Sequence, residues 1–311
     1  MRRGHLRGLS RLIAVSRLPG LTRPTKAACS NQPLQVSVKA PIVRAITTLS
    51  RFNVGSLLVH SDGEVIGVLT ERDVMRNVRP RCSAIVQDII SPDDAVVSER
   101  WPLERSVRIM LDGDMSHMPV VGMGGKVNAM LSVPEICRTL VEGTVEGVTP
   151  AEPSTLADAV EEAHRQRMAS EVANGKLVAP PSQLICQVDA DATVEEAVAC
   201  MRECLTSSIA IAGPRAEGVA AVGLFTQRDL LNCLAGRAAG DDAQWGAPVS
   251  EHMTPSADLL RLEPEFPVFE ALMLMVQRGA SHLTIGPHDA LDHLVGVLSM
   301  RALLKFVVEH A

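Results

Sequence analysis

The chain has 311 residues, of which 46% are hydrophobic, and this length allows two domains of ordinary size that each bury a core. Five Phe, two Trp and no Tyr leave it without the aromatic side chains on which single-stranded nucleic acids stack, and its formal net charge of -6 repels phosphate backbones. No apolar run approaches the roughly 18 residues that a membrane span needs, so we expect neither nucleic acid nor a membrane as a partner.

The N-terminal segment is strongly basic. The first acidic residue is Asp62, and ten Lys or Arg residues precede it. Arg3, Arg7 and Arg11 share one face of a helical wheel, a composition typical of an organelle transit peptide. We therefore predict that residues 1–32 are a transit peptide or a disordered segment, and that the protein is mitochondrial, with a plastid as the alternative. A disordered basic tail that contacts an acidic partner is the competing interpretation.

A short motif occurs four times: an apolar run, Gly or Ala, two residues, a hydroxyl side chain and usually an acid three positions later. The copies read GVLTERD at 67–73, AMLSVPE at 129–135, GLFTQRD at 223–229 and GVLSMRA at 296–302. Each copy follows an amphipathic helical stretch and a short apolar strand, and precedes another helix. The predicted order within a repeat is therefore strand, helix, strand, strand, helix. The predicted first helices are Val43 to Arg51, Leu103 to Leu111, Val194 to Leu205 and Val268 to Gln277.

A longer period groups the repeats in pairs. The segments VQDIISP at 86–92 and VSEHMTP at 249–255, which we call the opening segments, precede the second and fourth copies. We predict one pair at 33–142, with repeats at about 35–80 and 85–142. The second pair is predicted at 182–311, with repeats at about 183–236 and 247–311. Residues 143–181 are predicted to be a linker with an amphipathic helix over Thr155 to Val172.

The four repeats and the opening segments resemble CBS domains, the units named after cystathionine beta-synthase. The resemblance implies an α+β fold of four βαββα repeats in two tandem pairs, with clefts that accept adenosine nucleotides. It implies a non-catalytic sensor that binds AMP, ADP, ATP or a related adenosyl ligand as a regulatory ligand, as in energy sensing. The regulated partner would be an enzyme, a kinase or a thioredoxin-like protein, and a homodimer is expected. The alternative is a ligand-independent assembly module with degenerate sites.

The repeated motif has its own chemistry. A hydroxyl at the end of a strand and the start of a helix lies where free N–H groups favour an anion, and the acid can accept both hydroxyls of a ribose. A capping box, in which the same side chains satisfy the helix start, is the competing interpretation. Repeats 1 and 3 keep the full motif, whereas repeats 2 and 4 vary it, which favours selective ligand binding. The candidate ligand-binding residues are Thr70, Arg72, Asp73, His117, Ser132, Glu135, Thr226, Arg228, Asp229 and Ser299.

Basic side chains near the motif suit phosphate. Arg72 and Arg228 are predicted to contact phosphate oxygens, with a surface ion pair as the alternative. His117 and His282 begin equivalent strands and are predicted either to touch phosphate or to be structural.

The sequence indicates other reactive or metal-binding side chains only weakly. Seven Cys occur without C-x-x-C spacing, which indicates reduced thiols, although Cys200 and Cys204 lie one helical turn apart. The loop GPHDALDH at 286–293 has metal-ligand chemistry, but a solvated hairpin tip is favoured. We predict no metal site, no prosthetic group and no enzyme activity, because the sequence lacks a recognisable catalytic motif.

Overall fold

The structure is a computed structural model that describes residues 18–80, 82–90, 95–144, 154–173, 185–215, 218–235, 242–287 and 294–310. All four repeats have the predicted order of elements, and the α+β fold class is confirmed. The elements of repeats 1 and 2 are β2 (Gln35–Ser37), α2 (Ile42–Arg51), β3 (Ser56–Ser61), β4 (Glu64–Thr70) and α3 (Glu71–Asn77), then β5 (Val97–Ser98), α4 (Leu103–Asp112), β6 (His117–Val121), β7 (Val127–Ser132) and α5 (Val133–Thr144). Those of repeats 3 and 4 are β8 (Gln187–Asp189), α7 (Val194–Glu203), β9 (Ser208–Arg215), β10 (Gly218–Thr226) and α8 (Gln227–Leu234), then β12 (Arg261–Leu262), α9 (Val268–Arg278), β13 (His282–Ile285), β14 (Gly296–Ser299) and α10 (Met300–His310).

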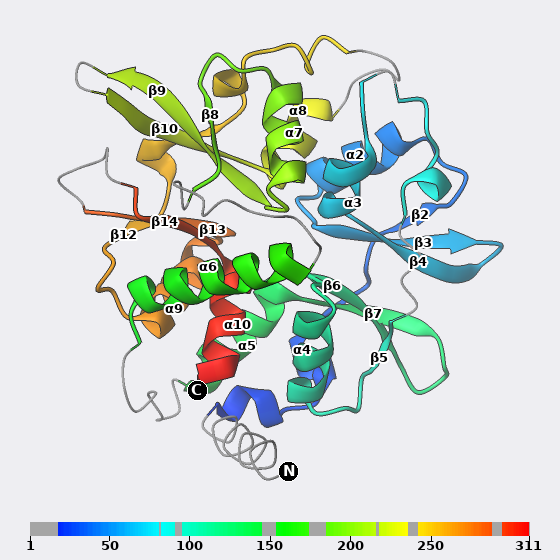
Figure 1. Ribbon diagram of the computed structural model, residues 1–311. Coiled ribbons are helices and arrows are strands. Elements are labelled where there is room, and N and C mark those ends of the chain that lie inside the picture. Colours follow the sequence, from blue (N-terminus) through cyan, green and yellow to red (C-terminus); the bar gives the residue numbers. More distant parts are fainter. Residues whose placement is uncertain are drawn as a thin grey trace.

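Each repeat forms its own small sheet, and the four sheets lie around the molecule in Figure 1. Within each sheet the first strand runs parallel to the second, and the second pairs antiparallel with the third. The parallel step needs a crossover connection, which the first helix of the repeat supplies. Helix α2 shows why these helices form: it buries Ile42, Ala45, Ile46 and Leu49, the spacing of one helical face.

The first helix of every repeat is followed, within a few residues, by a residue with a left-handed backbone. Asn53, Asp114, Leu205 and Gly279 have φ angles of 49°, 55°, 51° and 65°. These four residues occupy equivalent positions, three residues before the second strand begins. Gly, Asn and Asp tolerate this conformation best, so the backbone requirement alone explains three of the four residue types.

Within a pair, the opening segment before the second repeat packs on the first repeat. Val86 at the start of the opening segment donates its N–H to Ala40 O of repeat 1 at 2.9 Å. The other opening segment follows the same rule, because its strand β11 (Thr254–Pro255) pairs with β10 of repeat 3. Each opening segment therefore packs on the repeat that precedes it in the chain, whereas we had assigned it to the repeat that follows.

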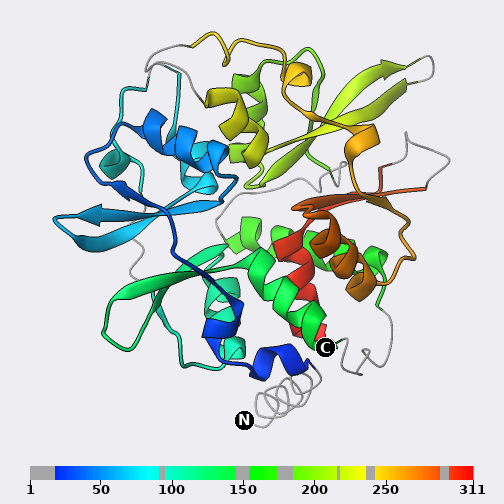
Figure 2. The same cartoon turned by 180° about the vertical axis from the view of Figure 1, so that it is seen from behind.

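The N-terminal segment takes the corresponding place on repeat 2. Residues 18–31 form the short helices η1 (Pro19–Thr22) and η2 (Thr25–Ala28) and strand β1 (Cys29–Asn31), which pairs with β7. Leu18 and Leu21 are fully buried, and Figure 2 shows the dark blue segment along the base of repeat 2. The expectation that all of residues 1–32 are disordered or a transit peptide is therefore wrong for residues 18–31, and residues 1–17 lie outside the described part of the chain.

The predicted linker helix is α6 (Leu156–Ala173), and it packs on repeat 4. Leu156 donates its N–H to Phe266 O at 2.9 Å, and both Leu156 and Ala159 are buried. The helix is therefore part of the second pair's core, not a separate connection.

Two hydrophobic cores join the two pairs. Helices α2, α3, α7 and α8 of repeats 1 and 3 share one core, and helices α4, α5, α6, α9 and α10 share the other with the N-terminal segment. The sheets of repeats 1 and 2 meet through a smaller cluster of Leu58, Val68 and Met130. A single chain therefore closes four repeats into one ring-like body, with sheets facing within a pair and helices facing between pairs (Figure 1).

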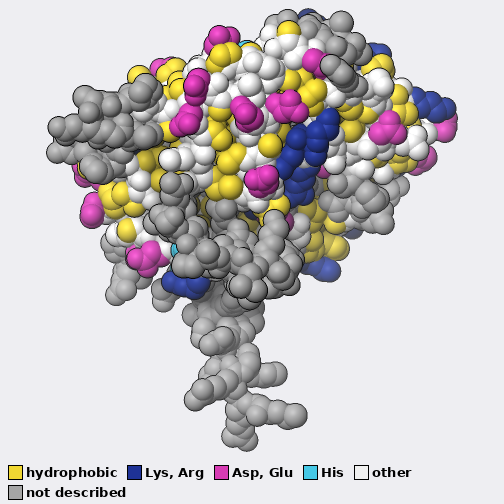
Figure 3. All heavy atoms as spheres, turned by 45° about the horizontal axis from the view of Figure 1, so that its top comes forward, with side chains coloured by type: hydrophobic (Ala, Val, Ile, Leu, Met, Phe, Trp, Pro, Cys, Tyr) yellow, Lys and Arg dark blue, Asp and Glu magenta, His cyan; other side chains and the backbone are white. Residues whose placement is uncertain are grey.

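The outer surface is mixed in character. Figure 3, in which the top of Figure 1 comes forward, shows hydrophobic, acidic and basic side chains side by side on this face, with one short stripe of basic side chains among them. Within the described ranges, the structure contains no helix of sufficient length and apolar character to cross a lipid bilayer.

Candidate functional site

The two intact motifs form capping boxes. Thr70 begins α3, and both its N–H and its Oγ1 donate to Asp73 Oδ2, at 2.8 and 2.7 Å. Thr226 begins α8 and makes the same two bonds to Asp229 Oδ2, again at 2.8 and 2.7 Å. We expected these carboxylates to point into clefts between repeats, and the structure instead shows one oxygen of each bound to its own helix start.

This geometry is not specific to the motif. Thr193 and Glu196 at the start of α7 form the same box, as do Thr155 and Asp158 at the start of α6. The capping interpretation therefore accounts for the observed contacts of Oδ2. It does not use the second carboxylate oxygen, and the ribose contact of Asp73 and Asp229 remains a prediction.

The second oxygen of Asp229 contacts the opening segment of repeat 4. Thr254 Oγ1 donates to Asp229 Oδ1 at 3.4 Å, a long bond. Burial raises the pKa of Asp229, while the bonds from Thr226 and Thr254 and the charge of Arg228 lower it. We did not include Thr254 among the candidates, although the hydroxyl before Pro in both opening segments was a usable signal. Its counterpart Ser91 lies outside the described residues.

In the two altered motifs the hydroxyl also forms a hydrogen bond within its own helix start. Ser132 Oγ donates to Glu135 Oε2 at 2.6 Å, and burial raises the pKa of Glu135. Ser299 Oγ accepts the N–H of Ala302 at 3.2 Å, so it caps α10 without an acid. Ser132 and Ser299 thus have clear structural roles, and their predicted ligand contacts remain untested.

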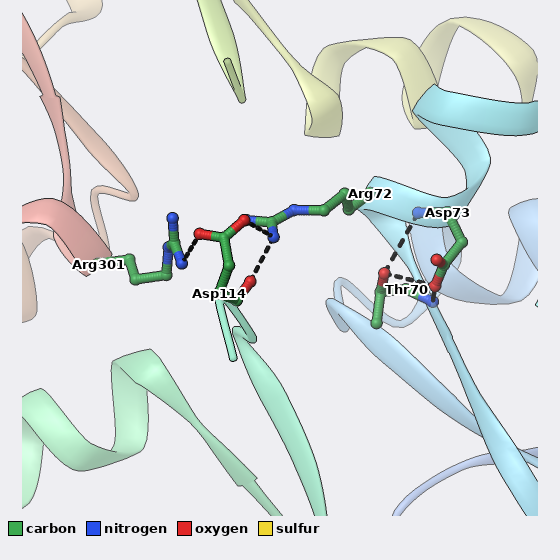
Figure 4. A network of polar contacts seen from close by, with 5 residues as sticks. All are labelled: Thr70, Arg72, Asp73, Asp114 and Arg301. Atoms are coloured by element: carbon green, nitrogen blue, oxygen red, sulfur yellow. Dashed lines mark hydrogen bonds and ion pairs between the residues drawn. The ribbon is translucent and has the colours of Figure 1, made fainter. Parts of the chain in front are cut away.

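Arg72 points away from its motif toward the centre of the molecule (Figure 4). Its Nη1 donates to Asp114 Oδ2 at 2.8 Å and also binds the backbone oxygen of Asp114. Arg301 of repeat 4 binds the other oxygen, Oδ1, of the same carboxylate. Two guanidinium groups from different pairs therefore share one carboxylate from repeat 2.

Arg228 has a different environment. Its Nη2 forms an ion pair with Glu71 Oε1, and its Nη1 donates to Leu49 O at 3.3 Å, so it connects repeat 3 to repeat 1. Burial raises the pKa of Glu71, and the charge of Arg228 opposes that rise. Arg228 therefore has a structural partner that is largely buried, with 19% of the Glu71 side chain exposed.

Arg72, Arg228 and Arg301 occupy the same position of the repeated motif, two residues after the hydroxyl, where repeat 2 has Pro134. Arg301 is not among the ligand-binding residues predicted from the sequence. Asp114, which joins two of these arginines, was missed altogether.

His117 and His282 lie between the two repeats of each pair. A Cβ on Gly55 of repeat 1 would lie 2.6 Å from the His117 ring, and His282 Nε2 lies 2.8 Å from Ser207 Oγ of repeat 3. Burial lowers the pKa of both imidazoles to about 4, and for His117 the charges of Arg228 and Arg72 contribute to this shift. Both rings are therefore neutral near pH 7, which limits them to neutral contacts with phosphate. His117 Nδ1 is buried and lacks a hydrogen-bond partner among the described residues.

The sulfur atoms of Cys200 in α7 and Cys204, the residue that follows this helix, lie 3.9 Å apart. Within the described ranges no three His, Cys, Asp or Glu residues are placed to bind a metal ion. The acidic and His residues of the loop at 286–293 fall outside those ranges.

The chain is similar to known proteins both in sequence and in fold. The family model described as CBS domain matches residues 26–80 and 249–309. A solved structure from Methanocaldococcus jannaschii, a candidate archaeal homologue of g-AMPK, covers 91% of this chain and 99% of its own length, with 13% identity and a TM-score of 0.70. An uncharacterized conserved protein from Pyrococcus horikoshii covers 92% of this chain and 100% of its own, with 17% identity and a TM-score of 0.54. At these identities the likeness concerns the fold alone.

A curated relative also has no assigned function. It is a 17.7 kDa protein of Acidianus ambivalens, 28% identical over 120 residues, which are 38% of this chain and 73% of that protein. These three proteins come from archaea, which contain neither mitochondria nor plastids, so the predicted mitochondrial location and its plastid alternative are wrong.

Proposed function

The chain is a CBS-domain protein with four repeats in two tandem pairs, and we propose that it is a non-catalytic regulatory protein that binds an adenosine nucleotide. The ligand's phosphates would lie near the centre of the molecule, at the arginines that follow the intact motifs. Its ribose would bind the acids of those motifs, and its adenine would lie against the adjoining apolar strands.

The shared carboxylate of Asp114 is the observation that supports this proposal most. Arg72 and Arg301 together carry two positive charges, and Asp114 supplies one negative charge between them. The next residue after Arg72 is Asp73, and the motif hydroxyl Thr70 lies at the same helix start (Figure 4). A phosphate group would meet two guanidinium groups, and arginine matches phosphate geometry well.

The acids can retain their caps while they bind a sugar. Each capping box engages Oδ2, and a carboxylate has further acceptor positions. At Asp229 the bond to Oδ1 from Thr254 is 3.4 Å long, so a ribose hydroxyl would replace a weak contact.

Regulation would follow from the position of the site. Arg72, Asp114 and Arg301 belong to repeats 1, 2 and 4, so a ligand at this point contacts both pairs. A ligand that binds one arrangement of the pairs more tightly shifts the population toward that arrangement, and a partner can recognise the change.

The partner would be an enzyme, a kinase or a thioredoxin-like protein, and a homodimer remains a prediction. One chain already covers the helical faces of both pairs.

Calorimetric titration and thermal melting of the full chain test this proposal. AMP, ADP, ATP and GMP are titrated separately, and an adenosine nucleotide should raise the melting temperature with concentration as mass action requires. Arg72→Met should weaken binding at least tenfold, whereas Arg44→Met, on an exposed position of α2, should leave it unchanged. The alternative, a ligand-independent assembly module, requires that no nucleotide changes the melting temperature and that no binding heat is measured.

A further inference from the structure

We propose that Asp114 is an internal competitor for the phosphate ligand: its carboxylate occupies the position between Arg72 and Arg301 that a phosphate group would take. The inference rests on the proposed function for the identity of the ligand, but it concerns a residue outside the repeated motif. It assigns to Asp114 the control of affinity at this site.

The geometry of the two arginines suits a phosphate group. Arg72 Nη1 lies 2.8 Å from Asp114 Oδ2, and Arg301 Nη1 binds Oδ1, so each oxygen of one carboxylate faces a different guanidinium (Figure 4). A phosphate group presents several oxygens in a similar spacing and carries more negative charge. The two positive charges repel each other, since the charge of Arg301 lowers the pKa of Arg72, and one carboxylate balances only one of them.

Asp114 is the most exposed member of these ion pairs. The Asp114 side chain is 57% exposed, compared with 21% for Arg72 and 27% for Arg301. Exposed ion pairs contribute little net free energy, so a ligand can displace this carboxylate at small cost. Arg228 provides the contrast, because its partner Glu71 is only 19% exposed and remains in place as a structural contact.

Asp114 occupies a position that the other three repeats fill without an acid. The equivalent left-handed residues are Asn53, Leu205 and Gly279, so Asp114 is the one acid at this position among the four repeats. The backbone is equally satisfied by Asn or Gly, as repeats 1 and 4 show. The negative charge is therefore not needed for the turn, and it stands in the one repeat whose motif has Pro134 in place of the arginine.

Displacement of the Asp114 carboxylate would change the contacts between repeats. The contact between Asp114 and Arg301 connects repeat 2 to repeat 4, and the contact with Arg72 connects repeat 2 to repeat 1. A phosphate that replaces the carboxylate removes both side-chain contacts of Asp114 and joins the two arginines through the ligand instead. Ligand binding would thus exchange one set of links between repeats for another.

The test compares the full wild-type chain with Asp114→Asn, which removes the charge and keeps a side chain that this backbone position accepts in repeat 1. Asp112→Asn, an exposed change of the same kind two residues away, is the matched control. Calorimetry with AMP and, separately, with pyrophosphate measures affinity. We expect Asp114→Asn to bind both about tenfold more tightly than the wild type, with Asp112→Asn unchanged. Adding Arg301→Met to Asp114→Asn should abolish the gain.

Unchanged or weaker affinity of Asp114→Asn for both ligands would overturn the inference, and binding of AMP by the wild type would show that the proposed function survives. Tighter pyrophosphate binding by the variant, with no AMP binding by either protein, would support the internal competitor and refute the nucleotide function. If Asp114→Asn does not fold, Asp114→Gly replaces it, because Gly279 occupies the equivalent position in repeat 4. The same outcomes then apply.

Discussion

Arg202 in α7 and Met75 in α3 are joined across the boundary between the two pairs: Arg202 Nε donates to the backbone oxygen of Met75 at 2.7 Å. The same guanidinium donates from Nη2 to Val78 O at 2.6 Å. These carbonyls lie near the end of α3, where backbone oxygens have no partner within the helix. One side chain of repeat 3 therefore completes the helix end of repeat 1 and fixes how the two helices meet.

Replacing Arg202 by Met should lower the free energy of unfolding by about 1–3 kcal/mol, because it leaves two carbonyl groups without their donor while keeping most of the apolar stem. Urea denaturation followed by circular dichroism measures the change. Arg44→Met on α2, an exposed position, is the control and should stay within about 0.5 kcal/mol of the wild type. Equal midpoints for both variants would show that this contact contributes nothing to the packing of the pairs.

The N-terminal segment should behave as part of repeat 2. Leu21 is fully buried against the core that includes α4, α5 and α9, so Leu21→Ala should cost about 2–5 kcal/mol. Removing residues 1–17 leaves every described contact of the segment in place and should preserve the melting temperature. Removing residues 1–31 deletes β1 with both helices η1 and η2 and should lower it strongly. A melting temperature that is the same for both truncations would contradict the packing of this segment.

The elements themselves could be predicted from the sequence to within a residue or two. Leu103 to Leu111 was predicted for α4, which is Leu103–Asp112, and Val268 to Gln277 for α9, which is Val268–Arg278. Both helices have a strong apolar stripe, and the motif hydroxyls mark where the second helices begin. Local periodicity and repetition are sufficient for this level of structure.

The way in which the repeats assemble could not be predicted from the sequence. Nothing local to Val86 in the sequence indicates whether it packs on the repeat before it or on the one after it. The contact between Asp114 and Arg301 joins residues far apart in the chain, and it exists only once four repeats have closed. The basic character of residues 18–31 indicated a targeting segment, although Leu18 and Leu21 anchor it in a core. The composition of this segment indicated its charge but did not indicate that it is buried.

The two buried histidines should make stability depend on pH. Burial lowers the pKa of His117 and of His282 to about 4, whereas an unfolded chain has an ordinary value of about 6.5. The unfolded state therefore binds protons between these values that the folded state does not. Stability from these groups is fully present above pH 6.5 and falls as the pH drops toward 4. Urea unfolding at a series of pH values measures the slope.

His282→Gln supplies the matched comparison for this pH effect, because Gln cannot titrate and can still hydrogen-bond to Ser207. We expect the variant to lose less stability than the wild type between pH 6.5 and pH 4. An identical slope in the two proteins would mean that His282 is protonated in the folded state as readily as in the unfolded one.

The glycines of the two intact motifs should differ in their tolerance of Ala. A methyl group on Gly223 would lie 2.5 Å from Met253 Sδ and 2.7 Å from Thr254 O, so it would push the opening segment away from β10. The same group on Gly67 would meet Ile90 Cδ1 at 3.7 Å, an ordinary contact. Gly223→Ala should therefore destabilise the protein by about 1–3 kcal/mol and Gly67→Ala by less than about 1 kcal/mol. Thermal melts that rank the two variants in the opposite order would contradict the predicted crowding at Gly223.

A comparison of Asp229 with Glu196 separates capping from ligand binding. Both acids form capping boxes, with Thr226 and Thr193, but only Asp229 belongs to a repeated motif. Asp229→Asn should cost about 0.5–2 kcal/mol of stability, and Glu196→Gln should also lower the stability, since each weakens one helix start. Only Asp229→Asn should also reduce the affinity for the adenosine nucleotide, by about tenfold or more, because an amide offers a ribose one acceptor where the carboxylate offers two. Calorimetry measures the nucleotide affinity of both variants. Equal affinities of Asp229→Asn and Glu196→Gln for the nucleotide would leave Asp229 as a helix cap alone, and would confine ligand recognition to the arginines at the centre.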